Sequence, residues 1–284
     1  MISPKKKLLL LHSSNDLYGA SKIFLQLIDL LTKNGFDIHV IVPEKGMLDD
    51  FLNKKNITVS YHELGVLRKK YLNPLGLFNR LVTNIKAIKF LSKYIKNHSI
   101  DLVYTNTSTI LCGGIAAKQN GIASLFHVHE IPTGNKLYEF FSGKIINRYS
   151  SKILTVSNSV KKHWLKYIDD KKIERIYNGI IFSKTDSLIK TERNQEDFVI
   201  TSVARLIPYK GHGYLIDVAN ELIKKSPKFR FLIVGDTLSS YAFYEKNVKQ
   251  KVKDLGLENK IKLVDIIMFE HHYDNMIKKG YTFV

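Results

Sequence analysis

The sequence contains a single cysteine, Cys112, in 284 residues, so no disulfide can form within the chain. This excludes a disulfide-stabilised fold and indicates a reducing cytosol. Long hydrophobic runs are missing too. The longest aliphatic run near the start is Leu8 to Leu11, whereas a membrane-spanning helix needs about 18 apolar residues. The same run is too short for the core of a signal peptide. We therefore expect the chain to remain in the cytoplasm, where it is made.

Several catalytic motifs are absent as well. The sequence has no Cys-x-x-Cys or His-Glu-x-x-His cluster, so a zinc site is not expected. It also has no Gly-x-x-x-x-Gly-Lys-Ser/Thr loop and no Gly-x-Gly-x-x-Gly fingerprint, which argues against ATP hydrolysis and nicotinamide binding. No two aspartates lie two positions apart, so an Asp-x-Asp metal clamp is missing.

Acidic residues are few: 26 of them stand against 44 lysines and arginines, which leaves a formal charge of +18. Such a charge favours polyanionic partners, namely nucleic acid, an anionic membrane surface or phosphorylated substrates. The cations are spread along the chain and no recognised nucleic-acid-binding motif is present, so we do not expect a nucleic acid partner. The choice between the other two depends on the site residues.

The apolar pattern is typical of alternating strands and helices. Helical stripes such as Ala20–Leu31 separate short apolar runs, which predicts parallel βαβ units with helices on both faces of a sheet. The expected strands are Leu8–His12, Ile38–Val42, Ile57–Tyr61, Asp101–Tyr104, Ser124–Val128, Lys152–Val156, Phe198–Val203, Phe229–Val234 and Ile261–Val264. The predicted fold class is therefore α/β.

A polar stretch near the middle divides this pattern into two units. We predict an N-terminal Rossmann-like domain over residues 1–182, a linker over 183–196 and a partial C-terminal Rossmann-like domain over 197–284. The second unit has room for about three strands, whereas a doubly wound domain carries about five or six. The tail from Phe269 to Met276 continues neither pattern, so we expect a truncation or an altered reading frame after about Val264.

The strongest site signal opens the second unit, in the segment Ser202–Gly211. A buried strand ends there, and Arg205 and Lys210 follow it beside a glycine turn that leads into a helix. Ligands of open α/β sheets bind outside the carboxyl ends of the strands. A guanidinium and an ammonium beside a helix N-terminus suit a diphosphate. The alternative is a pair of solvated cations on a loop.

This segment resembles the Gly-Arg-Leu-x-x-x-Lys-Gly element of the retaining two-domain glycosyltransferases of family 4, with Ala204 in place of the first glycine. The resemblance covers the chain to about Val264. It implies a GT-B-like fold, in which two Rossmann-like domains face a cleft, the first binding the acceptor and the second the nucleotide-sugar donor. It also implies that Arg205 and Lys210 bind the diphosphate of the donor and stabilise the leaving group, so that no metal is needed.

Two segments of the first domain match the family as well. Gly19 lies in a loop that looks like the family's glycine-bearing turn before the first helix, which implies a donor contact; a tight turn alone is the alternative. The segment Phe126–Glu130 is similar to the family's strand that ends in histidine and an acidic residue. The match implies that His129 hydrogen-bonds the donor sugar and that Glu130 orients it. A structural histidine is the alternative.

Three shorter matches follow. The pair Asn178 and Gly179 is similar to the family's Asn-Gly element and implies donor contacts, unless it forms only a turn. Gly235 ends a strand that resembles the family's strand beside the nucleotide, which implies a further donor contact. At a third match, a strand-to-helix turn, we expect Ser157 or Asn158 to cap the helix.

One family motif is missing. Two glutamates separated by seven residues hold the donor sugar and the ribose in that family, and no such pair follows Gly235. The later glutamates are Glu245, Glu258 and Glu270, and the residues eight positions on are Lys253, Ile266 and Lys278. An inactive remnant or a sugar-nucleotide-binding module is therefore the alternative to an active enzyme.

The resemblance predicts transfer of a hexosyl unit, with retention, from a nucleoside-diphosphate sugar to a lipid-linked saccharide in surface polysaccharide, O-antigen or capsule synthesis. Between Arg68 and Lys96 cations interleave with apolar residues, which indicates peripheral binding to the anionic inner face of the plasma membrane. The alternative is a helix with an apolar inner stripe and a solvated basic face. The segment Lys161–Lys166 is a second candidate, with Trp164 as an interfacial anchor.

Overall fold

The computed structural model describes residues 5–17, 19–68, 71, 73–132, 136–179, 197–237 and 241–264. The chain divides into two compact units, residues 1–181 (unit 1) and 182–284 (unit 2), and each is described by itself. The predicted linker over 183–196 and the tail after Val264 lie outside the described residues.

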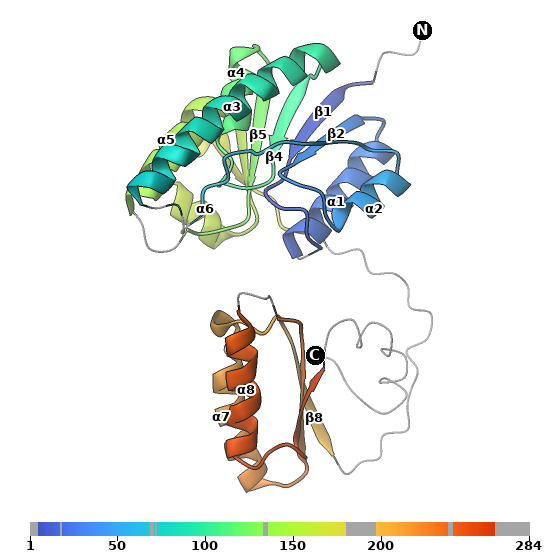
Figure 1. Ribbon diagram of the computed structural model, residues 1–284, viewed down its shortest axis with the longest axis vertical. Helices are drawn as coiled ribbons and strands as arrows, with labels where there is room; N and C mark the ends of the chain where they lie inside the picture. Colours follow the sequence, from blue (N-terminus) through green and yellow to red (C-terminus); the bar gives the residue numbers. More distant parts are fainter. Residues whose placement is uncertain are drawn as a thin grey trace. The chain divides into compact units, whose positions relative to one another are not determined.

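Unit 1 is built on a sheet of seven parallel strands in the order β3-β2-β1-β4-β5-β6-β7 (Figure 1). The strands are β1 Lys7–Leu11, β2 Asp37–Val42, β3 Thr58–Tyr61, β4 Leu102–Thr105, β5 Ala123–Val128, β6 Lys152–Thr155 and β7 Ile173–Arg175. The strand order reverses between β1 and β4, which is the doubly wound arrangement. Because all strands are parallel, their carboxyl ends lie at one edge of the sheet.

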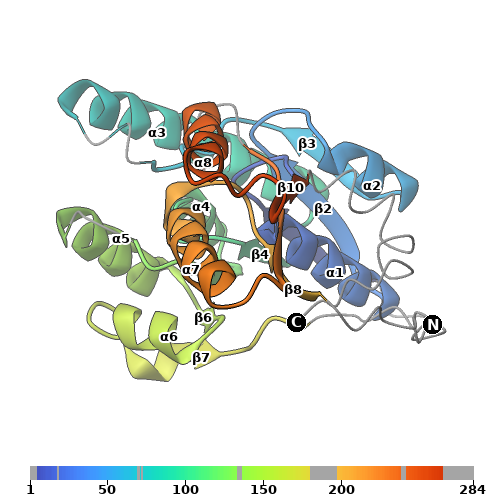
Figure 2. The ribbon, with the colours of Figure 1, turned by 90° about the horizontal axis from the view of Figure 1, so that it is seen from below.

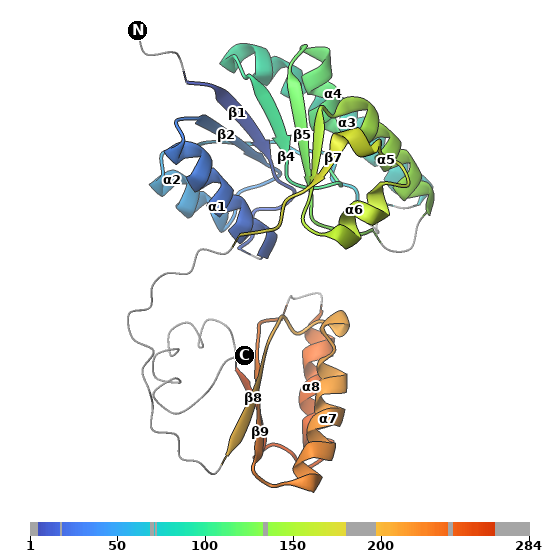
Figure 3. The same cartoon turned by 180° about the vertical axis from the view of Figure 1, so that it is seen from behind.

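Helices cover both faces of this sheet (Figure 3). They are α1 Gly19–Lys33, α2 Leu48–Lys54, α3 Pro74–His98, α4 Cys112–Gln119, α5 Lys136–Tyr149 and α6 Asn158–Trp164. Side chains alternate along a strand, so Leu8 and Leu10 of β1 pack with α1 and α2, while Leu9 and Leu11 pack with α3 and α4. This two-sided burial explains the continuous apolar run of β1. Cys112, the first residue of α4, is fully buried.

Unit 2 contains three parallel strands in the order β10-β9-β8. They are β8 Phe198–Val203, β9 Phe229–Val234 and β10 Ile261–Val264, and these bounds agree with the predicted ones. The helices α7 His212–Lys225 and α8 Ala242–Asp254 pack against each other and against the sheet (Figure 2). Their apolar stripes bury Ile216 and Val248 against Phe231 and Ile233 of β9.

The first turns of α3 correct one expectation. An inner apolar stripe would bury Phe78, Leu81 and Ile85, yet these side chains are 68%, 58% and 47% exposed. The buried residues of α3 are instead Thr83, Ala87, Leu91, Tyr94 and Ile95. The interpretation of this segment as a helix with an inward apolar face is therefore wrong for its N-terminal half, which directs apolar side chains outward.

Trp164 corrects a second expectation. Its side chain is fully buried, and its indole Nε1 donates a hydrogen bond to the carbonyl oxygen of Glu130 at 3.2 Å. It therefore cannot act as an interfacial anchor. Within the ranges that the structure describes, no helix combines the length and the apolar character needed to cross a membrane.

Candidate functional site

Polar side chains gather where three neighbouring strands of unit 1 end. β1, β4 and β5 lie next to one another, and the residues that follow them are His12, Asn106 and His129. Nε2 of His129 lies 2.9 Å from Oδ1 of Asn106, and Nδ2 of Asn106 lies 3.1 Å from Nδ1 of His12. His129, the predicted catalytic residue, is thus one of three linked groups at the edge where open α/β sheets bind ligands.

His12 extends this set toward α1. Its Nε2 lies 3.1 Å from Oγ of Ser21, and that hydroxyl donates to Oδ1 of Asp16 at 2.8 Å. The imidazole of His12 also stacks on the ring of Phe24, with centroids 4.6 Å apart. His12 and Ser21 are both buried, so these hydrogen bonds replace contacts with water.

Burial keeps the imidazoles of this edge neutral. It lowers the pKa of His12 from 6.5 to about 4 and the pKa of His127 from 6.5 to about 3. Burial also lowers the pKa of His129, although the nearby carboxylate of Glu130 acts in the opposite direction. A neutral imidazole has one nitrogen that donates a hydrogen bond and one that accepts.

His127, to which the sequence assigned no role, lies beside His129. Side chains two positions apart in a strand share a face, and the centroids of the two imidazoles are 4.2 Å apart. The hydroxyl of Tyr104 lies 2.5 Å from Nδ1 of His127, and this hydrogen bond fixes the orientation of that ring. The ring of His127 is therefore held in one orientation, and the ring of His129 packs against it.

Glu130 does not orient the imidazole of His129 by a direct hydrogen bond. Its Oε1 accepts from Oγ1 of Thr107 at 2.7 Å and from the backbone N and Oγ of Ser108 at 2.8 and 2.7 Å. Its Oε2 accepts from the backbone N of His129 at 3.1 Å. The carboxylate ties the loop after β4 to the end of β5, and the expected contact with the ring is made by Asn106 instead.

The other predicted donor-binding residues of unit 1 lie at its surface. Gly19 is the first residue of α1, and Asn178 and Gly179 are exposed beyond the end of β7. A β-carbon at Gly19 or Gly179 would meet no atom within 4 Å, and neither glycine has a positive φ. The fold therefore does not itself require glycine at these two positions. Their donor contacts stay predictions.

Arg205 and Lys210 lie in the loop that joins β8 to α7, at the carboxyl edge of the sheet of unit 2. Pro208–Lys210 form a single 3₁₀ turn, and Gly211 follows with a φ of 77°, a left-handed conformation that favours glycine. α7 begins directly after this turn, and no side chain caps it. Two cations and the backbone N–H groups of a helix start therefore share one end of the sheet, an arrangement that suits a diphosphate.

Gly235 packs against the backbone of this loop from the end of β9. The backbone N of Ala204 donates to the carbonyl oxygen of Val234 at 2.9 Å, and that of Leu206 donates to Asp236 at 3.0 Å. These bonds hold the loop that carries Arg205 beside the end of β9. Gly235 thus has a packing role, and its contact with a nucleotide stays a prediction.

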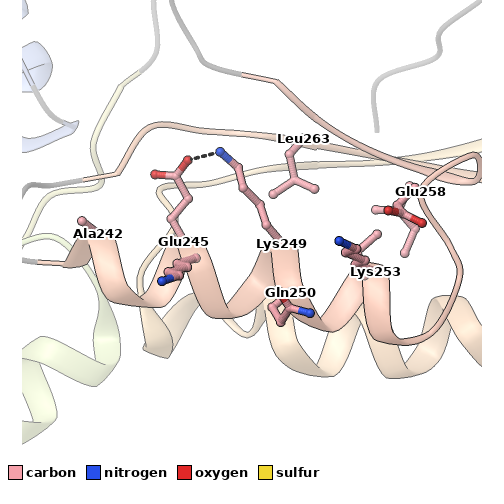
Figure 4. A pocket seen from close by; sticks show the side chains of 10 residues that line it. Ala242, Glu245, Lys249, Gln250, Lys253, Glu258 and Leu263 are labelled. Carbon is pink, nitrogen blue, oxygen red and sulfur yellow. Dashed lines mark hydrogen bonds and ion pairs between the residues drawn. The ribbon is translucent and has the colours of Figure 1, made fainter.

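The described part of unit 2 also has an open hollow along α8 (Figure 4). Glu245, Lys249 and Lys253 of α8 line it, together with Glu258 and Leu263. Nζ of Lys249 lies 2.5 Å from Oε1 of Glu245, so part of this charge is paired. None of the predicted site residues lines the hollow, which is therefore a feature separate from the Arg205 and Lys210 loop.

Among the residues that the structure describes, no three side chains of His, Cys, Asp or Glu form a cluster that could hold a metal ion. The positive charge at the sheet edge of unit 2 comes from Arg205 and Lys210.

Asn106 and His12 were not among the predicted site residues. Each directly follows an apolar strand, the same signal that pointed to His129. Reading the sequence for every polar residue at a strand end would have found both. Their mutual hydrogen bond depends on β1 and β4 being neighbours in the sheet, although the two residues are 94 positions apart in sequence.

Sequence comparisons follow the same two-part division. The family model described as Glycosyltransferase Family 4 matches residues 18–184, and the model described as Glycosyl transferases group 1 matches residues 183–284. The Escherichia coli enzyme UDP-Gal:alpha-D-GlcNAc-diphosphoundecaprenol alpha-1,3-galactosyltransferase is 28% identical over 276 residues, covering 86% of this chain and 67% of the enzyme. An uncharacterised glycosyltransferase of Haemophilus influenzae is 24% identical, covering 87% of this chain and 65% of the relative. The chain spans about two thirds of the length of these relatives.

Solved structures show the same fold. The Anabaena protein HepE in complex with UDP and glucose gives a TM-score of 0.70 at 23% identity, over 92% of this chain and 69% of HepE. A glycosyltransferase from Rickettsia africae gives 0.70 at 22% identity, over 92% of this chain and 68% of its own. The predicted α/β fold of the GT-B type is confirmed.

Proposed function

The chain belongs to Glycosyltransferase Family 4, and on that premise we propose that it transfers a hexosyl unit from a nucleoside-diphosphate sugar to a lipid-linked saccharide. The transfer retains the configuration of the sugar and serves the assembly of a surface polysaccharide such as O-antigen or capsule. Two similar proteins support this choice: the E. coli relative is named for UDP-galactose and a diphosphoundecaprenol-linked acceptor, and HepE was solved with UDP and glucose. The donor we propose is a UDP-hexose.

The observation that carries this proposal is the placement of Arg205 and Lys210 at the carboxyl edge of unit 2. Transfer separates a diphosphate from the sugar, and fixed positive charge stabilises the negative charge that develops on the leaving group. A guanidinium binds phosphate oxygens in a bidentate manner, and an ammonium adds a compact charge. The uncapped start of α7 adds backbone N–H donors. In this proposal these groups do the work that a metal ion does in other transferases.

In unit 1 we assign the sugar contact to His129. Its ring is partly buried, neutral, hydrogen-bonded to Asn106 and packed on His127. A neutral imidazole held in this way can hydrogen-bond a sugar hydroxyl without placing a charge beside the reaction centre. Gly19, with the Asn178 and Gly179 pair, is assigned to further donor contacts, and Gly235 of unit 2 likewise.

The lipid-linked acceptor calls for a surface that meets a membrane. We define the α3–α5 apolar surface as Leu75, Phe78 and Leu81 of α3 with Leu137 and Phe141 of α5; each of these side chains is at least 58% exposed. Both helices pack against α4, and basic residues accompany these apolar side chains in the sequence, namely Arg80 in α3 and Lys136 and Lys144 in α5. Apolar side chains can enter the headgroup region, while each cation near an anionic surface contributes about 1 kcal/mol. We therefore propose peripheral binding at the inner face of the plasma membrane.

Calorimetric titration with UDP-hexoses and GDP-hexoses tests the donor site. We expect a heat of binding with a UDP-hexose that disappears when Arg205→Ala and Lys210→Ala are combined. The matched control combines Lys246→Ala and Lys253→Ala, which removes two cations from the hollow along α8 and should leave binding unchanged. UDP-hexose binding that survives the loss of Arg205 and Lys210 would refute the proposal.

A transfer assay separates this function from a second candidate, a module that binds a sugar nucleotide without transferring the sugar. The observation in its favour is the missing pair of glutamates after Gly235. The assay combines labelled UDP-hexose with a polyprenyl-diphosphate N-acetylhexosamine, and NMR reads the anomeric configuration of the product. An α-linked product from an α-configured donor supports the transferase. Binding without any product supports the module instead.

A further inference from the structure

Five side chains at the carboxyl edge of unit 1 form one continuous hydrogen-bonded chain. It runs from His129 through Asn106, His12 and Ser21 to Asp16. The four links measure 2.9, 3.1, 3.1 and 2.8 Å between heavy atoms. The three middle members are nearly inaccessible to water: His12 is 2% exposed, Asn106 2% and Ser21 1%. Bulk water therefore cannot replace any of the internal links.

The carboxylate at one end sets the direction of every link. An ionised carboxylate only accepts hydrogen bonds, so the single hydroxyl proton of Ser21 points to Asp16. Ser21 must then accept from Nε2–H of His12, which leaves Nδ1 of that neutral imidazole as an acceptor. In the reverse direction Ser21 would donate to His12 and would have no proton left for Asp16.

The orientation of the Asn106 amide determines which ring nitrogen of His129 carries the proton. Because Nδ1 of His12 accepts, the amide nitrogen of Asn106 must face it, and the amide oxygen must face His129. An amide oxygen only accepts, so Nε2 of His129 carries the proton. The other nitrogen, Nδ1, then holds a lone pair, and among the described residues no protein group hydrogen-bonds to it. A hydroxyl group that approaches Nδ1 finds an acceptor already in place.

We propose that Asn106 is a positioning residue which, through the chain that ends at Asp16, holds His129 in its Nε2–H tautomer so that Nδ1 accepts a hydrogen bond from a hydroxyl of the bound sugar. This inference rests on the proposed function for the identity of the ligand. The tautomer itself follows from the contacts of unit 1. Without the chain, both neutral tautomers of His129 are populated, and only one of them can accept from the sugar at Nδ1.

Nitrogen NMR of histidine-labelled protein reads the tautomer without any substrate. The His129 signals are assigned by their loss in His129→Asn, and we expect only the Nε2–H form in the unmodified chain. Asn106→Leu, which removes the acceptor, should produce a mixture of the two forms. Asn106→Asp keeps an oxygen opposite Nε2 and should restore the single form. Asp16→Asn, whose amide can donate to Ser21, allows the chain to reverse and should populate the second tautomer.

Kinetics then links the tautomer to the reaction. We expect Asn106→Leu to lower kcat for hexosyl transfer about 10-fold or more, while the affinity for UDP alone is unchanged and Asn106→Asp recovers part of kcat. The control Asn120→Leu removes a half-buried amide whose Nδ2 donates to the carbonyl oxygen of Ala116, and it should change neither the tautomer nor kcat.

Two results would overturn the inference: a proton on Nδ1 of His129 in the unmodified chain, or an Asn106→Leu variant with unchanged tautomer or unchanged kcat. Failure of the proposed function looks different. In that case the chain binds no UDP-hexose, while the NMR signature of His129 is still the one expected from the hydrogen bonds.

Discussion

A β-carbon on Gly235 would lie 1.9 Å from the carbonyl oxygen of Ala204. The two residues follow the neighbouring strands β9 and β8, and the absence of a side chain at 235 lets the two strand ends come together. Arg205 follows Ala204 directly, so this backbone contact fixes the starting point of the loop that carries the two proposed phosphate-binding cations.

Gly235→Ala should therefore destabilise unit 2 by about 2 kcal/mol, because the backbone must move to relieve the overlap. Urea unfolding followed by circular dichroism measures the change. Gly213→Ala in the same unit is the matched control, since a β-carbon there meets no atom within 4 Å and glycine is unfavourable inside a helix. We expect the control to be stabilised by about 0.5–1 kcal/mol. Equal effects of both substitutions would contradict the packing role.

Ser157 caps α6, as the strand-to-helix match predicted. Its Oγ accepts from the backbone N of Val160 at 3.2 Å, and its backbone is extended. Ser157→Ala should lower the free energy of unfolding by about 1 kcal/mol. Ser159→Ala, at an exposed position within the same helix, should change it by no more than a few tenths of a kcal/mol. Thermal and urea unfolding of both variants compare the two sites, and a neutral Ser157→Ala would show that the cap has no stabilising effect.

The buried histidines predict acid sensitivity. The pKa of His12 falls from 6.5 in the unfolded chain to about 4 in the folded one, so the unfolded state binds the proton first as the pH falls. The free energy of unfolding should therefore be at its full value above pH 6.5 and decline between pH 6.5 and about 4. The full shift corresponds to a loss on the order of 3 kcal/mol from this group.

Unfolding measured at a series of pH values tests this expectation. His12→Gln should remove one proton from the difference between the states, which reduces the slope by about 1.4 kcal/mol per pH unit in that window. His127, with a pKa lowered to about 3, should still contribute its own slope in the variant. An identical pH dependence in His12→Gln and the unmodified chain would contradict the assignment.

The α3–α5 apolar surface predicts binding to anionic vesicles. Phe78→Ser combined with Leu81→Ser should weaken binding to vesicles that contain phosphatidylglycerol at least 10-fold, because burying each apolar side chain contributes about 2 kcal/mol. Leu30→Ser on α1 is the matched control, since Leu30 is 59% exposed on another helix. Vesicle flotation at low and physiological salt measures both. Equal loss in the control, or none in the double variant, would argue against this surface.

The sequence predicted the sheet of unit 2 to the residue, because its strands combine β-branched and aromatic residues with clear turns on either side. α2 and β7 of unit 1 were missed. α2 has seven residues with only Leu48 and Leu52 buried, and β7 has three, so neither is long enough to show a period. The apolar pattern of α3 was recognised, but its covered face was misassigned. A pattern shows which residues share a face, whereas only the tertiary arrangement decides what covers that face.

For the candidate site, too, the sequence predicted the positions of residues but not the contacts that they make. His129, Arg205 and Lys210 stand at strand ends, which a linear reading can locate. The contacts of Asn106 with His129 and with His12 cannot be read in this way, because they depend on which strands are neighbours. Glu130 shows the difference: adjacency in sequence suggested that it orients His129, yet it binds the loop at Ser108, and Asn106 holds the ring.

The burial of Cys112 has a practical consequence. Burial raises the pKa of its thiol to about 12, and its Sγ lies 3.3 Å from the carbonyl oxygen of Leu64, so at neutral pH it is neither ionised nor accessible to maleimides. The folded natural chain therefore does not react with thiol-directed dyes at neutral pH. One cysteine introduced into each unit would accept a fluorophore pair without prior mutation of the native residue. Energy transfer between the dyes could then report directly on movement of the two units when a sugar nucleotide binds.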